Sequence, residues 1–282
     1  MKTMTIKGNI EALSPIHHGG SESHGTIKPI LALPTVVRNA ETGEEEIDLI
    51  PTIHGNSIRG NLRSLIMQDF LDLLDYQLDS KKVYHFLFDG GMLEAVDAKD
   101  KGAINLKMKD SIRKHIPPIS LLGSALGNQM IQGKLKVGMA DIVCKETAHY
   151  LPYDEDGAPN FSAYGLRSKD FGTRLDSLKE DREEGEAATQ MKYEFQTLIT
   201  GTRFTHEFRL DDALDWEYAC LIRMLNLWNT RPSIGGKSGS GYGKVRLNYD
   251  YVPDDEKPYL EYVAQNKESI VSELDEMVKK WK

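Results

Sequence analysis

The chain has 282 residues, 28% of them charged and 40% hydrophobic, a composition typical of a globular protein built as one elaborated domain. It carries no apolar run long enough to span a membrane, no signal-peptide core at its N-terminus, and two cysteines without CxxC pairing, so we expect a cytoplasmic protein without disulfides or structural zinc. The net charge of −8 does not exclude a nucleic-acid partner, because the acid concentrates in residues 40–48, 180–186 and 250–282 and leaves the remainder basic.

Apolar and polar side chains alternate over residues 3–12, which predicts a half-buried strand. A loop at residues 14–20 follows, with the adjacent histidines His17 and His18, and then a second apolar stretch at residues 30–37. These histidines and His24 define no metal geometry, because no carboxylate or cysteine stands at ligand spacing. We therefore expect no metal site here, and favour loop histidines beside a phosphate or base.

The stretch IPTIHGNSIRGNLR at residues 50–63 predicts the start of a helix that runs to about residue 78. Asn56 or Ser57 is expected to cap it, and Arg59 and Arg63 stand one turn apart on its polar face. Because the N-terminus of a helix is positive, two arginines there disfavour the helix unless they and the free N–H groups bind an anion. The alternative is that both arginines lie on the surface with solvated guanidinium groups.

Residues 81–130 show no clear pattern, whereas residues 133–143 alternate again and predict a second core strand. Residues 145–192 are polar and rich in glycine, which indicates an insertion that projects from the body. A disordered acidic loop is the alternative reading of that composition. The basic residues of this insertion that we assign to the candidate site are Arg167, Lys169 and Arg174.

The remaining pattern predicts a strand over residues 195–210, a helix capped by Asp211 or Asp212, a strand over residues 244–252, and one final helix from Pro258 to Trp281. The order of elements is strand, helix, strand, insertion, strand, helix, strand. That is the βαββαβ succession of an α+β, ferredoxin-like fold, in which both helices cover one face of an antiparallel sheet.

A glycine-rich loop at residues 234–243 precedes the last strand; it contains Lys237, and Lys244 follows it. Its backbone N–H groups could wrap an oxyanion, because no Cβ atoms intrude. It fits neither the P-loop nor the GxGxxG pattern, and it leads from helix to strand, so ATP hydrolysis is not expected. Lys244 and Leu247 stand where an RNA-recognition sheet would carry stacking aromatics. We expect a basic loop lying against a phosphodiester chain; a glycine-rich turn without a ligand is the alternative.

Residues 50–63, an IPGSSLRGxLR-type element, and the glycine-rich loop before the last strand together resemble the RAMP superfamily of CRISPR-associated proteins. The likeness is greatest to the repeated backbone subunit that coats guide RNA in multisubunit effector complexes. Residues 14–20 resemble the loop after that family's first strand. The stretches that look most like the type IV branch are residues 85–91, 119–123 and 144–147.

The resemblance implies a ferredoxin-like, RRM-like palm with large insertions. The palm would comprise residues 1–144, with an inserted segment at about 81–130, and residues 193–252. A thumb-like extension would be supplied by residues 145–192, and a C-terminal helical segment by residues 253–282.

The implied function is a subunit that binds guide RNA (crRNA), oligomerises along it as a helical filament with other effector subunits, and presents it to target nucleic acid. RNA-cleaving type III subunits carry an aspartate where this chain has Ala32 or Leu33, so we expect no cleavage and no cofactor. The alternatives are a RAMP endoribonuclease that processes precursor crRNA, with His17 or His18 as general acid or base, and a nuclease that cuts target RNA. The residues assigned to the RNA site are His17, His18, Asn56, Ser57, Arg59, Arg63, Gly235, Gly236, Lys237, Ser238, Gly239, Gly241, Tyr242 and Lys244.

Overall fold

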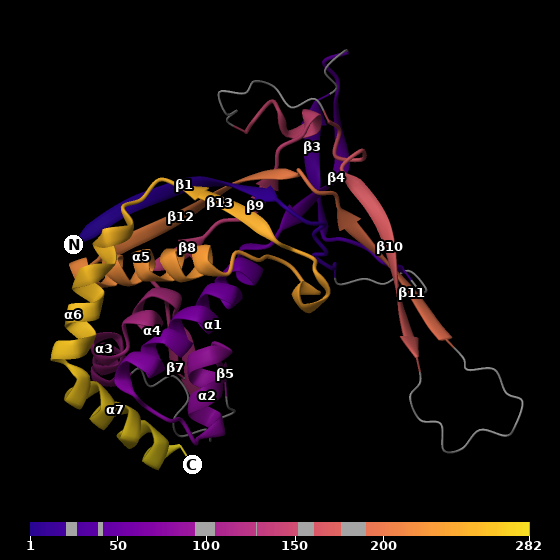
Figure 1. Cartoon of the computed structure of the whole chain (residues 1–282). Coiled ribbons are helices and arrows are strands. Elements are labelled where there is room, and N and C mark those ends of the chain that lie inside the picture. Colours follow the sequence, from indigo (N-terminus) through magenta and orange to yellow (C-terminus); the bar gives the residue numbers. More distant parts are fainter. Residues whose placement is uncertain are drawn as a thin grey trace, which may run out of the picture.

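The computed structural model describes residues 1–20, 27–38, 42–93, 105–127, 129–151, 161–175 and 190–281. Its largest element is an antiparallel seven-stranded sheet that arches over a layer of helices (Figure 1). The strands along its path are β13 (Val245–Tyr249), β1 (Lys2–Ala12), β12 (Arg203–Ala213), β9 (Ala140–Ile142), β4 (Glu45–Ile53) and β3 (Ala32–Arg38). The seventh strand, β8 (Leu135–Val137), pairs with β12 beside β9.

The expected βαββαβ succession is present in this sheet and its helices. In chain order it comprises β1, α1 (Gly55–Leu74), the β8–β9 segment, β12, α5 (Asp215–Thr230) and β13. β1 lies between β12 and β13 and runs antiparallel to both, while α1 and α5 pack together under the sheet. The alternation predicted for the first strand is confirmed, because Ile6 and Ile10 are buried and Thr5 and Lys7 are exposed.

The single strand predicted over residues 133–143 is in fact two short strands, with a break at Gly138. The start of α1 fills this break. A Cβ atom on Gly55 would lie 2.4 Å from the carbonyl oxygens of Val137 and Gly138, so only glycine fits there. Met139, which the alternation over residues 133–143 would put on the same face as Leu135, lies between the two strands and is 39% exposed.

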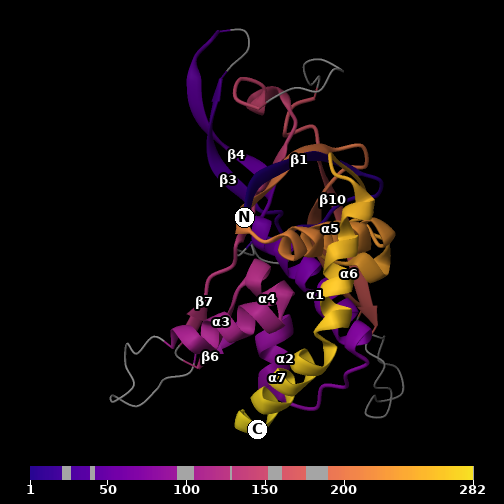
Figure 2. The same cartoon turned by 90° about the vertical axis from the view of Figure 1, so that its left-hand side faces the viewer.

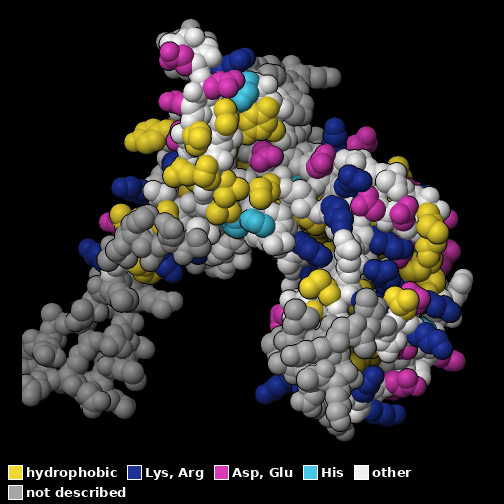
Figure 3. All heavy atoms as spheres, turned by 180° about the vertical axis from the view of Figure 1, so that it is seen from behind, with side chains coloured by type: hydrophobic (Ala, Val, Ile, Leu, Met, Phe, Trp, Pro, Cys, Tyr) yellow, Lys and Arg dark blue, Asp and Glu magenta, His cyan; other side chains and the backbone are white. Residues whose placement is uncertain are grey.

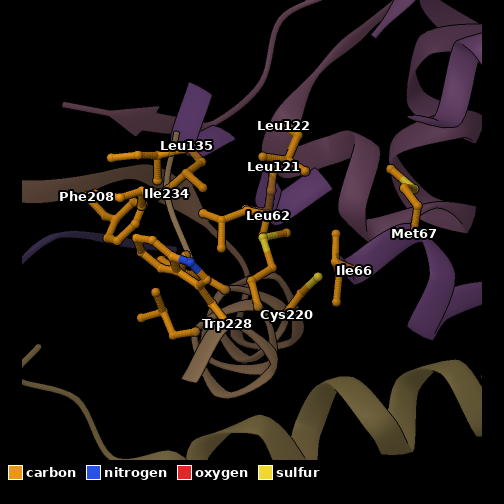
Figure 4. Close-up of a cluster of buried hydrophobic side chains, with 14 of the residues drawn as sticks. Leu62, Ile66, Met67, Leu121, Leu122, Leu135, Phe208, Cys220, Trp228 and Ile234 are labelled. Carbon is orange, nitrogen blue, oxygen red and sulfur yellow. The ribbon is translucent and has the colours of Figure 1, made fainter. Parts of the chain in front are cut away.

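The core fills the space between the sheet and its two main helices. Figure 4 shows Trp228 of α5 packed among Leu62 of α1, Phe208 of β12 and Ile234, and all four are at most 4% exposed. The indole N–H of Trp228 donates to the backbone oxygen of Ser233 at 3.1 Å. The core therefore fixes the beginning of the glycine-rich loop.

An inserted layer packs beside α1. Its elements are α2 (Lys81–Phe88), β5 (Gly91–Leu93), α3 (Leu106–His115), α4 (Pro117–Leu122), β6 (Ser124–Gly127) and β7 (Gln129–Ile131). α4 begins at two prolines, which suit the first turn of a helix, and all six of its residues are buried. Such a helix has no polar side, so periodicity could not reveal it.

Two hairpins leave the body of the molecule (Figure 1). One is β3–β4, whose second strand the sequence reading missed because the outer half of β4 is exposed on both faces. The other pairs β10 (Arg167–Leu175) with β11 (Gln190–Leu198), and β2 (Ile27–Lys28) adds to β11 in parallel. Residues 94–104, 152–160 and 176–189 of the two expected insertions lie outside the described residues.

Within the insertion expected at residues 145–192, the described β10–β11 hairpin projects from the body, but its root is part of the core (Figure 1). After a 3-10 turn at η1 (Lys145–Thr147), Ala163 and Leu166 are 2% and 5% exposed, which anchors the root of the hairpin. The strand predicted over residues 195–210 is likewise two strands, β11 and β12, joined by a turn at residues 199–202.

The C-terminal region contains two helices, not the single helix predicted. They are α6 (Lys257–Gln265) and α7 (Lys267–Lys280), and the short turn η3 (Pro253–Glu256) precedes them. The side-chain amide of Asn266 donates to the Tyr262 backbone oxygen at 2.8 Å. This bond competes with the backbone hydrogen bonds of the helix, and the helix is interrupted at Asn266. No described helix is both long and apolar enough to cross a membrane.

The predicted cap of α5 is also wrong. Asp211 and Asp212 belong to β12, and α5 begins after Leu214, whose N–H donates to the Glu217 carboxylate at 2.8 Å. An acid in the first turn thus reaches back to the start of the helix, as in a capping box.

Candidate nucleic-acid interface

The glycine-rich loop is fixed at both ends. Its Ser233 oxygen accepts from Trp228 and from the Asn61 amide of α1 at 2.9 Å, and the Ile234 N–H donates to the Gly243 oxygen at 2.9 Å. A Cβ atom on Gly243 would lie 2.1 Å from the Ile234 oxygen, and its φ is +77°. This glycine is required by packing, whatever the loop binds.

The loop also pairs with residues 14–20, which the sequence reading had placed beside a phosphate or base. The Gly236 N–H donates to the His17 oxygen at 2.7 Å, and the Gly243 N–H donates to the Pro15 oxygen at 2.8 Å. Gly235, with φ +75°, approaches the same His17 oxygen so closely that a Cβ atom would lie 2.6 Å away. Two segments far apart in sequence therefore form one continuous surface.

The tip of the loop is open to solvent. Ser238, Gly239 and Ser240 form the turn η2 (Ser238–Ser240), and they and Gly241 are exposed. No atom lies within 4 Å of a Cβ placed on Gly239 or Gly241. These four residues can approach a ligand with their backbone.

Lys237 lies against the projecting hairpin instead of extending into solvent. Its Nζ sits 4.2 Å from the ring centre of Phe195 and 4.6 Å from that of Tyr193, both on β11. Tyr242 contacts the edge of the Phe195 ring and donates its hydroxyl hydrogen bond to Asp170 of β10. That bond lowers the pKa of Asp170 and raises the pKa of Tyr242 to about 12. Lysine and tyrosine thus dock the loop onto the hairpin.

Lys244 remains exposed at the end of the loop, so it is the lysine free to contact a ligand.

The two histidines hold the first loop in place. His17 is 8% exposed, and its Nδ1–H donates to the Gln196 carbonyl oxygen at 2.8 Å, since a carbonyl can only accept. His18 Nε2 accepts from the His54 N–H at 3.1 Å. Burial, and then the neighbouring His54 and His17, lower the pKa of His18, which keeps it neutral as an acceptor.

His54 caps α1, and this corrects the prediction of Asn56 or Ser57. The Asn56 N–H donates to His54 Nδ1 at 3.1 Å, and the Ser57 N–H donates to the His54 oxygen at 2.9 Å. The carbonyls of residues 137 and 138 also press against the start of the helix. The expected cluster of free N–H groups is therefore already covered, while the Asn56 side chain is exposed and that of Ser57 half-buried.

Arg63 is a structural residue, which neither sequence interpretation anticipated. It is 6% exposed, and its guanidinium donates to the backbone oxygens of Leu122 at 3.1 Å, Gly123 at 2.9 Å and Leu87 at 3.4 Å. These are the last carbonyls of α4 and α2, where helix dipoles are negative. Burial lowers the pKa of Arg63 to about 10.

Arg59 is half-buried and donates to the same Leu122 oxygen, and burial lowers its pKa as well. It also lines an open pocket of about 890 Å³ between α1 and the inserted layer, together with Asn56 and Lys136. Arg63 lines the same pocket but is only 6% exposed, so Arg59 is the arginine of the pair with more surface available to a ligand.

The basic residues assigned to the insertion also include one that bonds within the protein and one that is exposed. Arg167 donates to the Leu49 oxygen of β4 and ties the two hairpins together, whereas Lys169 is exposed on the outer face of β10. Arg174 lies opposite Met191 near the end of the described hairpin.

The sequence reading missed Tyr193 and Phe195 as site residues. They alternate with Lys192 and Glu194 along β11, so their period of two was the available signal.

The described part of this surface offers backbone groups and cations, and polar side chains occupy the outer face of β1 and β12. The outer positions of β1 and β12 include Lys7, Asn9, Thr205 and Glu207. His206 points to the buried face, where its Nδ1 accepts from the Tyr249 hydroxyl at 2.8 Å, and burial lowers its pKa to about 4. Within the described ranges, no three His, Cys, Asp or Glu side chains are grouped to hold a metal ion.

Comparisons with known proteins bear on the whole arrangement. A family model of the RAMP superfamily matches residues 9–246, a range that contains residues 14–20, α1 and the glycine-rich loop. Among solved structures, a chain described as "Type IV-B CRISPR Complex" superposes with a TM-score of 0.55 and 20% identity, covering 88% of this chain and 91% of that chain. At that identity the likeness shows a shared fold. A search of curated proteins found no match.

Proposed function

The chain belongs to the RAMP superfamily, and from that premise we propose that it is the guide-RNA-binding backbone subunit of a type IV CRISPR effector complex. The observation that carries the proposal is the joining of three separate segments into one surface. The first loop, the start of α1 and the glycine-rich loop are linked by the bonds Gly236–His17, His54–His18 and Asn61–Ser233. Superfamily membership implies a ferredoxin-like core, which the βαββαβ sheet fits.

This surface suits a phosphodiester chain better than individual bases. An exposed loop with open space around Gly239 and Gly241 lets the backbone approach phosphates, and Lys244 supplies a cation at its end. Arg59 supplies a second cation in the pocket between α1 and the inserted layer. Such contacts carry no base information, so we expect affinity that is independent of sequence and falls with salt. The exposed carboxylates of the β3–β4 hairpin stand away from this loop (Figures 1 and 2).

The β10–β11 hairpin is suited to the role of a thumb. It projects from the base of the glycine-rich loop, to which Lys237 and Tyr242 bind it, so a guide on the loop would meet the hairpin. In our proposal the hairpin reaches a neighbouring copy and divides the guide into segments that pair with target.

The proposal includes no cleavage by this chain. Ala32 and Leu33, the positions of the type III aspartate, begin β3. The environment of the histidines supports a structural role, because His17 Nδ1 is engaged with Gln196 and His18 Nε2 with His54. An endoribonuclease would require a ring nitrogen of His17 or His18 to reach RNA and exchange protons with it, and His17 is 8% exposed.

A pair of glycine variants tests the interface. Gly241→Val places a side chain on the open loop at φ +88°, and Gly43→Val places the same side chain in open space at φ +73° in the β3–β4 turn, with similar backbone strain. By fluorescence anisotropy with RNA long enough for one copy, Gly241→Val should weaken binding about tenfold or more, and Gly43→Val should not. Equal affinities would remove the loop from the interface.

The absence of cleavage needs a separate assay. Wild-type protein with guide, complementary RNA and Mg²⁺ should leave both strands at full length. Regularly spaced cuts in the target would instead support the nuclease alternative.

A further inference from the structure

The outer face of the main sheet has a row of polar side chains that crosses five strands. In the strand register Asn248 lies opposite Asn9, and Asn9 lies opposite Thr205. Thr205 in turn lies opposite Asp141, and Asp141 lies opposite Thr52. Residues paired in this way point to the same face of a sheet. The five side chains therefore form one continuous row, on the side of the sheet away from α1 and α5 (Figure 1).

A pocket of about 660 Å³ opens over this row. Asn9, Thr205 and Asp141 line it, and Met139 and Leu151 add apolar side chains to its wall. Leu151 belongs to the segment that follows η1, so the sheet and this segment form the pocket together. The pocket thus combines hydrogen-bonding side chains with apolar side chains beside them.

Asp141 is the buried charge of this pocket. Its side chain is half-buried, and within the part of the chain that the structure describes its carboxylate has no hydrogen bond and no ion pair. Burial raises the pKa of Asp141, because the charged form loses hydration and gains no partner in return. A cationic donor that entered the pocket would offset the cost of this burial.

The other charges that line the pocket leave it negative. Glu207 and Asp250 are exposed, and Lys7 is the one cation among the described lining residues. His206 also lines the pocket, but its pKa of about 4 keeps it uncharged at neutral pH. With Asp141, three carboxylates therefore stand against one ammonium group.

Carboxylates elsewhere on the same face are already paired. Arg246 pairs with Glu11, and Arg209 pairs with Asp211 at 2.9 Å. Figure 3 shows basic and acidic side chains interspersed over the limb of the molecule that contains the helices as well. The excess of negative charge is therefore local to the pocket, where it repels a phosphate and attracts a cation.

The chemistry of the pocket suits a guanidinium group. Arginine carries five N–H donors in one plane and no acceptor, and its aliphatic stem packs on apolar side chains. The row offers the carboxylate of Asp141 beside hydroxyl and amide oxygens, and Met139 and Leu151 are placed to contact the stem. A lysine ammonium is more strongly hydrated and presents a point charge, so it gains less from a row of acceptors.

We infer that this pocket is a docking site for an arginine side chain of a different protein. In the docked state the guanidinium pairs with Asp141 and donates to the neighbouring oxygens of the row. The inference goes beyond the proposed function and does not depend on it, because the pocket and the glycine-rich loop share no lining residue.

Three matched peptides serve as probes. Each is a capped pentapeptide with two glycines on either side of a central residue, which is arginine, lysine or citrulline, the uncharged analogue of arginine. NMR titration of ¹⁵N-labelled protein follows the side-chain amide signals of Asn9 and Asn248. Asp141→Asn removes the charge of the pocket with little change in shape. The matched control is Glu11→Gln, which removes a charge from the same face outside the pocket.

The arginine peptide should shift both amide signals and bind in about the millimolar range, more tightly than the lysine peptide, and the citrulline peptide should not bind. Asp141→Asn should weaken the arginine peptide about tenfold or more, because a charge-assisted hydrogen bond is lost. Glu11→Gln should leave the affinity within about twofold of wild type, because its charge is already paired.

A second variant guards against a folding defect. Asp141→Asn should keep or raise the melting temperature, because its carboxylate has no partner to lose. Met139→Lys places an ammonium group in the same pocket, and it should also prevent binding of the arginine peptide. Undiminished binding to Met139→Lys would overturn the site.

Equal weakening by Asp141→Asn and Glu11→Gln would indicate general attraction to an acidic protein and would also overturn it. Stronger shifts of the two amides with adenosine monophosphate than with the arginine peptide would replace the inference with a nucleotide site. Self-association of the wild-type protein that the arginine peptide disrupts would place a second copy in the pocket, against the assignment to a different protein.

Discussion

Replacement of Arg63 separates a structural arginine from an RNA-binding one. Arg63→Ala removes two good charge-assisted hydrogen bonds, at 2.9 and 3.1 Å, and a longer one at 3.4 Å. Each good bond of this kind is worth about 1.5–3 kcal/mol, and the carbonyls left behind are buried. Burial of the guanidinium, which also lowers the pKa of Arg63, costs free energy and offsets part of what these hydrogen bonds contribute. We therefore expect Arg63→Ala to lower the free energy of unfolding by about 3 kcal/mol.

That loss is a large fraction of the stability of a typical domain. Arg59→Ala is the matched variant, because Arg59 is half-exposed and donates to one carbonyl, so it should cost about 1 kcal/mol. Urea unfolding followed by tryptophan fluorescence, to which the buried Trp228 contributes, measures both losses. In the conditions where it is folded, Arg63→Ala should bind short RNA almost like wild type. A loss of stability below about 1 kcal/mol together with a tenfold loss of RNA affinity would refute the assignment.

Three further outcomes are expected. Gly243→Ala should destabilise the fold, because its Cβ would lie 2.1 Å from a backbone oxygen, whereas Gly239→Ala, with no atom within 4 Å, should not; equal melting temperatures would contradict this. His206, with its pKa near 4, stays neutral in the fold while the unfolded chain takes up a proton below pH 6.5, so stability should fall by up to about 3 kcal/mol between pH 6.5 and 4, and His206→Asn should flatten that slope in urea titrations. A variant in which an Asn-Gly turn replaces residues 174–191, joining the register pair Thr173 and Lys192, should keep the melting temperature and abolish cooperative coating of RNA. Unchanged coating would show that the outer part of the hairpin has no role in assembly.

Elements with one buried and one solvated face could be predicted from the sequence. The strand β1, the helix α1 and the apolar face of α5 all show their period, because each has a buried face and a face with exposed or half-buried side chains. α4 is buried all round and the outer half of β4 is exposed all round, so neither has a period to read. These two elements were missed because their two faces do not differ in exposure to water.

Only part of the candidate site could be predicted from the sequence, because spacing reports on neighbours along the chain and not on distant segments. Glycine spacing and the histidine pair identify the two loops, but their partners come from distant segments. Arg63 acquires its role from the ends of α2 and α4, and Lys237 from Phe195 on β11. Local spacing contains no information on which carbonyl or ring will lie beside a side chain.

The number of copies bound per RNA tests the central claim most directly. Mass photometry of wild-type protein on single-stranded RNAs of increasing length measures this number without chemical change to either partner. If the chain coats guide RNA, the bound mass should rise in equal steps of one 31.8 kDa copy as the RNA lengthens, and the RNA should be recovered intact. One copy per RNA at every length, or recovery of shortened RNA, would contradict the account.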